Sequence, residues 1–157
     1  MPLVCTARPI TNRSADAACR ERPANTGRED PRRALGRLGE DLAAAHLDRL
    51  GLATLARNVR TRHGEIDLIV FDGRTLAFVE VKTRLARSSA RPLGPEEQPL
   101  AWLRPRQRAR VRRLARAWLC DSRHVRPTAR TIRFDAIGVI VDRRGRLVAL
   151  DHVEAAW

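Results

Sequence analysis

Apolar residues recur at helical spacing between residues 35 and 50, and a glycine, Gly51, follows as a C-terminal stop signal. The residues that fall on one side of this segment are Leu35, Leu38, Leu42, His46 and Leu50. Glu40 borders this apolar stripe. The pattern predicts an amphipathic helix over residues 35–50.

Apolar and β-branched residues then alternate or cluster in short runs, which predicts strands over residues 53–60, 66–71 and 76–83. Asp72-Gly73 lies between the last two runs and is a strong hairpin signal. Further on, 131–141 predicts a buried strand, and a turn at 143–146 leads into an apolar stretch at 147–150.

A second helix is predicted to begin at Pro105, a residue that suits the first turn of a helix. Its apolar stripe is formed by Val111, Leu114, Ala115 and Trp118. The segment 87–99 is rich in Pro, Gly, Ser and Glu and predicts a mobile loop. The element order is therefore αβββαβ, with an additional element at the C-terminal end.

Residues 1–33 show no apolar periodicity, which predicts a disordered extension or an over-long choice of start codon. The remaining residues, 34–157, suffice for one domain, because a chain of roughly 100 to 200 residues usually builds a single core. We therefore expect one folded α/β domain over residues 34–157.

The formal net charge is +13, which favours a polyanionic partner. The excess is local, because residues 84–133 hold 14 basic and 3 acidic residues, whereas residues 34–83 hold 7 of each. Lys82 is the single lysine among the 31 basic residues. A lysine retained in such an arginine-rich chain marks a place where a compact, titratable ammonium is useful, or is a chance survivor. The residues around Lys82 in the sequence are therefore needed to choose between these interpretations.

The three cysteines, Cys5, Cys19 and Cys120, are widely spaced and contain no CxxC pair, so neither a disulfide framework nor a zinc knuckle is indicated. No apolar run approaches the roughly 18 residues of a membrane span, and the first 30 residues lack the apolar core of a secretory signal. We therefore expect a soluble, cytoplasmic protein with no membrane partner.

Acidic residues interrupt two otherwise apolar strands, in Glu65-Ile66-Asp67 and in Val79-Glu80-Val81-Lys82. If the Asp72-Gly73 loop has two residues, Asp67 and Glu80 lie on a diagonal of one sheet face, roughly 7 to 8 Å apart at the backbone. A loop of four residues places them directly opposite one another. Either even length keeps the acids together, whereas an odd length or a bulge separates them.

Carboxylates crowded on one face repel each other unless a cation compensates them. Mg²⁺ or Mn²⁺ would do so, with Asp67, Glu80 and the Val81 carbonyl as ligands. A metal-bound water could then attack phosphorus, while Lys82 orients that water or offsets charge in the transition state. Glu40 is expected to act as an outer ligand or acid/base group. The alternative is a solvent-facing cluster of ion pairs, the usual fate of charged strand residues.

These residues resemble the bacterial UPF0102 (YraN-like) family, regarded as predicted endonucleases related to archaeal Holliday junction resolvases. The resemblance runs from about Leu35 to the C-terminus. The segments that carry it are Gly36-Arg37-Leu38-Gly39-Glu40, Arg57-Asn58, Gly64 to Ile69, Phe78 to Arg84, Ala117-Trp118-Leu119 and Arg133-Phe134-Asp135. It implies a restriction-endonuclease-like core in which Asp67, Glu80 and Lys82 match the PD-(D/E)XK signature and Glu40 matches a helix acid. Gln107 departs from the lysine that these proteins often carry there.

Arginines on the second predicted helix could neutralise phosphates, or could form an ordinary solvated face. The residues predicted to contact nucleic acid are Arg84, Arg106, Gln107, Arg110 and Arg113. His63, which would face Lys82 if the strands extend, is either a phosphate contact or a surface residue. Trp102 and Trp118 could stack on bases, but Trp118 belongs to the apolar stripe and is expected in the core, and the other histidines are expected to be structural.

The sequence thus favours a Mg²⁺- or Mn²⁺-dependent endonuclease that hydrolyses phosphodiester bonds in DNA, with branched or flapped DNA as substrate candidates. DNA is preferred over RNA as the partner. Two alternatives stay open: a non-catalytic nucleic-acid-binding protein that keeps the fold, and a ribosome- or RNA-associated basic protein with structural acids. The resemblance to dimeric resolvases also leaves a homodimer open.

Overall fold

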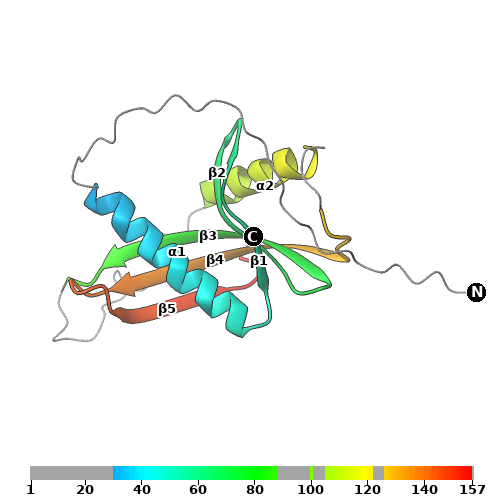
Figure 1. The fold of residues 1–157 in the computed structure, drawn as a ribbon. Helices are drawn as coiled ribbons and strands as arrows, with labels where there is room; N and C mark the ends of the chain where they lie inside the picture. Colours follow the sequence, from blue (N-terminus) through cyan, green and yellow to red (C-terminus); the bar gives the residue numbers. More distant parts are fainter. Residues whose placement is uncertain (1–29, 88–99, 101–104, 122–125, 157) are drawn as a thin grey trace, which may run out of the picture.

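The computed structural model describes residues 30–87, 100, 105–121 and 126–156, with the backbone alone at 105–108. The elements in chain order are α1 (Pro31–Arg49), β1 (Ala53–Thr61), β2 (Gly64–Phe71), β3 (Thr75–Leu85), α2 (Pro105–Leu119), β4 (Thr131–Val141) and β5 (Leu147–Val153). The strands form one sheet in the order β1-β2-β3-β4-β5, in which β3 and β4 are parallel and all other neighbours antiparallel (Figure 1). This is the predicted α/β class, a mixed sheet flanked by helices that is compatible with a restriction-endonuclease-like core, and β5 is the additional C-terminal element.

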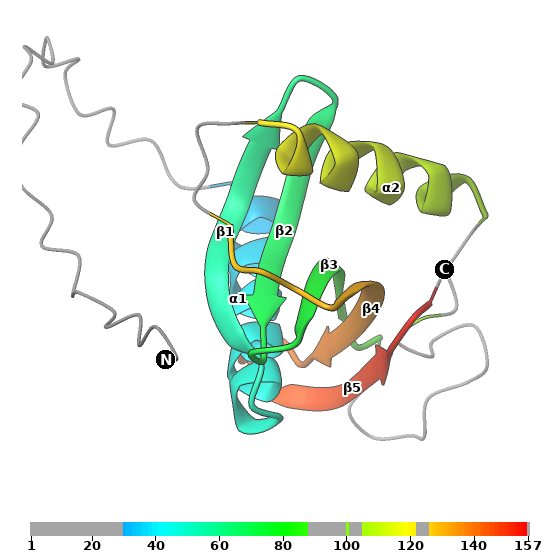
Figure 2. The same ribbon diagram turned by 90° about the vertical axis from the view of Figure 1, so that its right-hand side faces the viewer.

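The two helices cover opposite faces of the sheet (Figure 2). Alternate residues of β3 point to opposite faces of the sheet. On the α1 side the core contains Ala77, Val79 and Val81, and on the α2 side it contains Leu76 and Phe78. The α2 side of the second cluster is made of the predicted stripe, Val111, Leu114, Ala115 and Trp118. The prediction that Trp118 belongs to the core is confirmed, since it is 4% exposed and meets the Phe78 ring edge-on.

Helix α1 begins earlier than predicted and buries a different stripe. Asp30 caps it by accepting a hydrogen bond from Arg32 N at 2.9 Å, and α1 takes in residues 31–33, which the sequence assigned to the extension. The fully buried positions are Gly39, Ala43 and Leu47, whereas the predicted Leu50 is 53% exposed. Leu35, Leu38 and Leu42 of the predicted stripe do pack against the core on the α1 side, so the prediction is confirmed for them and wrong for Leu50. Small residues at 39 and 43 let α1 approach the sheet closely.

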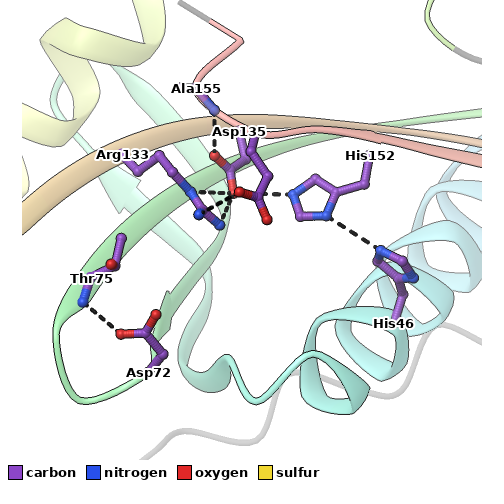
Figure 3. A network of polar contacts seen from close by, with 8 residues as sticks. His46, Asp72, Thr75, Arg133, Asp135, His152 and Ala155 are labelled. Carbon is purple, nitrogen blue, oxygen red and sulfur yellow. Dashed lines mark hydrogen bonds and ion pairs between the residues drawn. The ribbon is translucent and has the colours of Figure 1, made fainter.

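The turn between β2 and β3 has four residues, because Phe71 pairs with Leu76. Asp72 explains the length, because its Oδ1 accepts a hydrogen bond from Arg74 N at 2.8 Å. The same oxygen accepts another from Thr75 N at 2.6 Å (Figure 3). Gly73 lies at φ +93°, in the region that favours glycine. The two-residue loop is therefore excluded, and the alternative with directly opposed acids holds.

Several predictions lie outside the described residues. These are the disordered extension up to residue 29, the loop at 88–99, Trp102 and His124. In the part of the chain that is described, neither helix is both long enough and apolar enough to cross a membrane.

Candidate active site

The site lies where β2 and β3 part. Their pairing runs from Phe71–Leu76 to Leu68–Val79 and stops there. Beyond that point β2 stays paired with β1 as far as Gly64, and β3 stays paired with β4 as far as Leu85. Asp67 and Glu80 are the first residues past the last pair, one on each strand, so the sheet opens between them.

Asp67 and Glu80 reach across this opening from opposite sides. Asp67 Oδ2 accepts a hydrogen bond from the backbone N–H of Val81 at 2.7 Å, which ties β2 to β3 beyond the last backbone pair. Glu80 is 3% exposed, and its Oε1 accepts a hydrogen bond from Lys82 Nζ at 2.6 Å. Asp67, Glu80, Val81 and Lys82 therefore lie close together as predicted, although they do not share one flat sheet face because the strands diverge.

The pKa of Asp67 is shifted by its burial and by the neighbouring Glu80 carboxylate. Burial and, second, the negative charge of Glu80 raise the pKa of Asp67 to about 7. The Val81 hydrogen bond and the positive charge of Lys82 oppose this rise, while Glu40 adds to it. The Glu80 carboxylate thus disfavours ionisation of Asp67, and a cation between the two side chains would relieve this repulsion.

Two basic side chains face Glu80. Lys82, whose side chain is 39% exposed, holds Oε1, and Arg110 Nη1 on α2 lies 3.5 Å from the same oxygen. The Arg110 side chain also lies near Gly64 at the start of β2, since a Cβ added at Gly64 would be 3.5 Å from its Nη2. Positive groups therefore border the acids on the α2 side of the sheet.

Glu40 borders the site on the α1 side, and Gly39 brings it there. A Cβ on Gly39 would overlap the Thr83 side chain, 2.7 Å from its Cβ and 2.8 Å from its Cγ2, so only glycine lets α1 lie this close to β3. Glu40 Oε2 accepts a hydrogen bond from Asn58 Nδ2 at 2.9 Å. Among the groups named above, the negative charge of Glu40 has the smallest effect on the Asp67 pKa.

Asn58 is a site residue that strand alternation alone does not reveal. It lies within β1 at φ +51°, a conformation that asparagine tolerates better than most residues. The signal in the sequence was the Arg57-Asn58 pair, two polar residues inside an otherwise β-rich run. Arg57 in turn forms an ion pair with Asp41, so both members of the pair fasten β1 to α1.

A divalent ion fits the residues present, with only a partial protein shell. Among the described residues no three His, Cys, Asp or Glu side chains gather into a metal site. Mg²⁺, however, is commonly held by one or two carboxylates and keeps several waters. The Val81 carbonyl suits a third ligand, because the N–H and C=O of one strand residue point to the same side and the Val81 N–H points to Asp67. Mutual repulsion of Asp67 and Glu80 is the feature that such an ion would relieve.

The predicted nucleic-acid contacts are only partly described. Arg84, Arg110 and Arg113 are exposed, while the side chains of Arg106 and Gln107 lie outside the described residues. The suggestion that His63 faces Lys82 is wrong, because β2 leaves β3 before reaching it. His63 instead lies at the β1–β2 turn, where its Nε2 accepts a hydrogen bond from Arg62 Nε at 3.0 Å.

A second polar cluster centres on Asp135, which is completely buried in β4 (Figure 3). Arg133 Nη2 donates to Asp135 Oδ2 at 2.9 Å, and His152 Nε2 lies 3.1 Å from the same oxygen. His46 Nε2 on α1 is 3.3 Å from His152 Nδ1. The expectation that His46 and His152 are structural agrees with this network, which joins α1, β4 and β5 and which spacing along the chain could not reveal.

The fold and the site define a mixed α/β protein whose sheet opens around two acids and a lysine. The profile of the Uncharacterised protein family UPF0102 matches residues 39–139, which span Glu40, the opening and most of β4. The chain belongs to the UPF0102 family.

Relatives agree over most of the chain. A UPF0102 protein of Streptomyces griseus is 46% identical over 114 residues, covering 73% of this chain and 88% of the relative. One of Acidothermus cellulolyticus is 45% identical over 138 residues, covering 83% and 98%. One of Pelotomaculum thermopropionicum is 40% identical over 130 residues, covering 82% and 98%.

Proposed function

We propose that this protein is a Mg²⁺- or Mn²⁺-dependent endonuclease that hydrolyses phosphodiester bonds in DNA. The observation that carries the proposal is the meeting of Asp67 and Glu80 at the opening of the sheet, with Lys82 on Glu80. In an ordinary surface ion pair, Glu80 would be exposed to solvent and would not face a second carboxylate that repels it.

The divalent ion, when bound, supplies a water of lowered pKa and polarises a phosphoryl oxygen. Asp67 and Glu80 would hold the ion, and the hydrogen bond from Val81 fixes the Asp67 carboxylate. Hydrolysis forms one P–O bond to water and breaks the P–O bond to the leaving oxygen, so one proton must leave the water and one must reach the leaving oxygen. Glu40, held by Asn58 at the edge of the site, is assigned to the transfer of these protons with solvent water.

Lys82 is assigned to stabilising the transition state. Its ammonium lies at Glu80 Oε1, where it can donate to a non-bridging oxygen as negative charge develops in the transition state. Arg110, whose Nη1 lies 3.5 Å from Glu80 Oε1, would hold the phosphate beside the cut. Glu80 thereby serves as an anchor for positive groups as well as for the ion.

The proposal is tested by cleavage of labelled branched, single-stranded and duplex DNA, and of the matching RNA, with Mg²⁺ and without it. Wild type is compared with Asp67→Asn and Lys82→Met, and Asp151→Asn on the exposed surface of β5 controls for the loss of one carboxylate. Cleavage by wild type and Asp151→Asn alone is expected. Nucleic-acid binding by every variant with cleavage by none would overturn the proposal in favour of a non-catalytic binding protein.

A further inference from the structure

A hollow lies between the β1–β2 turn and the C-terminal half of α2, away from the paired acids. It consists of two neighbouring cavities of about 300 and 320 Å³ that share Arg62, Ala117 and Cys120 in their walls. Figure 2 shows the turn end of the β1–β2 hairpin beside α2. The basic residues of its walls define what we call the cationic cleft: Arg60, Arg62 and His63 from the turn, and Arg113 and Arg116 from α2.

Positive charge in the cationic cleft is poorly compensated. Its arginines are exposed, and in the described part of the chain none forms an ion pair with a carboxylate, although Asp121 contributes one acidic side chain to the wall. Arginines elsewhere do find acids, as in the pairs of Arg57 with Asp41 and of Arg133 with Asp135. Holding like charges together around a hollow is unfavourable without an anionic ligand.

The two walls of the cleft are held at a fixed separation. Thr61 pairs with Gly64 and closes a turn of two residues, while Thr61 Oγ1 donates to Gly64 O at 3.0 Å and accepts from His63 N at 3.1 Å. A Cβ added at Gly64 would lie 3.5 Å from Leu114 Cδ2, so the turn packs against α2. The cleft is thus preformed by backbone hydrogen bonds and helix packing.

The chemistry of the walls favours phosphates over bases. Guanidinium groups match phosphate oxygens with two parallel hydrogen bonds. Trp118 lines the cleft but is 4% exposed and committed to Phe78, so it offers no free face on which a base could stack. Contacts of this kind position a nucleic acid without reading its sequence.

Helix α2 contributes side chains both to the candidate active site and to the cationic cleft. Arg110 lies at Glu80 and at Gly64, and Arg116 follows six residues later, which is about 9 Å along a helix. One strand of duplex advances about 3.4 Å per nucleotide. A nucleic acid whose axis runs along α2 would therefore place the cleft about two to three nucleotides from a phosphate bound at Glu80.

We infer that the cationic cleft binds the phosphodiester backbone of the nucleic acid two to three nucleotides away from the phosphate at the acids. The location relative to a cut rests on the proposed function, whereas binding of the backbone does not. The occupant is a nucleic-acid backbone rather than a membrane surface, because the basic groups line a concave hollow between two elements instead of a flat face.

The test is the affinity for labelled duplex DNA and duplex RNA as a function of salt. Arg62→Gln/Arg116→Gln removes one charge from each wall, and Arg143→Gln/Arg144→Gln removes two exposed charges at the β4–β5 turn as a matched control. The cleft variant is expected to weaken binding about 10-fold or more and to lower the slope of log K against log salt by about 1.8, the share of two phosphates. The control should bind within about 2-fold of wild type, and thermal unfolding should show both variants folded.

Unchanged affinity and slope in the cleft variant would overturn the inference. Competition by polyglutamate as effective as that by DNA of equal charge would also overturn it, in favour of an acidic protein partner. Failure of the proposed function looks different: no variant cleaves, yet the cleft variant still loses affinity. If wild type cleaves and the cleft variant keeps both its affinity and its KM, the inference fails while the function stands.

Discussion

The backbone N–H of Val81 donates to Asp67 Oδ2 at 2.7 Å, so a side chain of β2 takes the place that a backbone carbonyl fills where the strands are still paired. This hydrogen bond holds the two strands at a set separation just as they part. It also keeps a half-buried carboxylate beside Glu80 despite their repulsion. The cost of that arrangement should be measurable as a dependence of stability on pH.

We expect Asp67 to destabilise the metal-free protein as pH rises. Its pKa of about 7 lies above the ordinary 3.8, so between these values the folded state holds a proton that the unfolded chain has released, and stability falls as pH increases through this range. Asp67→Asn should be more stable than wild type at about pH 8, and its advantage should shrink by on the order of 2 kcal/mol at about pH 5.5. Urea unfolding with a chelator measures this. Parallel pH profiles of the two proteins would contradict it, and Asp151→Asn is the control.

Substitution of Gly39 should destabilise the protein because of its packing against β3. In Gly39→Ala the new methyl group meets Thr83, so we expect a loss of about 1 to 3 kcal/mol and a weaker hold on Glu40. Gly36→Ala on the same helix has open space around it and should gain up to about 1 kcal/mol from helix propensity. Thermal or urea unfolding compares the two. Adding Thr83→Ala to Gly39→Ala removes the Oγ1 and Cγ2 atoms that the new methyl group meets, so partial recovery of stability is expected. No recovery would contradict the packing of α1 on β3.

Asn58 should act through Glu40. Asn58→Gly keeps the backbone at φ +51° but removes the donor to Glu40, so it should fold normally and lower kcat about 10-fold with little change in KM. Asn58→Ala adds backbone strain of about 1 kcal/mol or more. Steady-state cleavage and urea unfolding of both variants check this. Normal kcat in Asn58→Gly would show that Glu40 needs no support from β1.

The buried ion pair between Arg133 and Asp135 should contribute far more to the free energy of unfolding than the exposed ion pair between Arg133 and Glu154. Arg133→Ala leaves Asp135 buried without its cation, and we expect a loss of about 3 to 5 kcal/mol. Glu154, whose side chain is 56% exposed, also contacts Arg133, yet Glu154→Ala should cost about 1 kcal/mol or less. Equal effects of the two substitutions in urea unfolding would mean that Asp135 finds another partner.

The elements of this fold were predictable because their signals are local. Apolar spacing marks α2 and the strands, and Asp72-Gly73 marks the hairpin that brings Asp67 and Glu80 together. The length of that hairpin loop was not predictable, because Asp72 widens it through its own side chain. The point at which β2 and β3 separate could not be predicted either, because the alternation of side chains along a strand does not show where its pairing ends.

Contacts between distant segments were the other part that the sequence could not supply. The overlap that Gly39 avoids involves Thr83, and the Glu40 hydrogen bond involves Asn58 on another element. Such contacts depend on how α1 lies on the sheet. The buried state of Asp135 likewise requires β5 to bring His152 beside it, although Arg133 and Asp135 are near neighbours in the sequence.

The central claim is that Asp67 and Glu80 share a divalent ion, and calorimetric titration with Mn²⁺ tests it most directly. Wild type and Glu154→Gln, which removes an exposed carboxylate, are expected to bind the ion alike, and Glu80→Gln to lose it. Lys82→Met should bind at least as tightly as wild type, because it removes a competing positive charge from Glu80. Mn²⁺ binding that is absent in wild type, or unchanged in Glu80→Gln, would contradict the account.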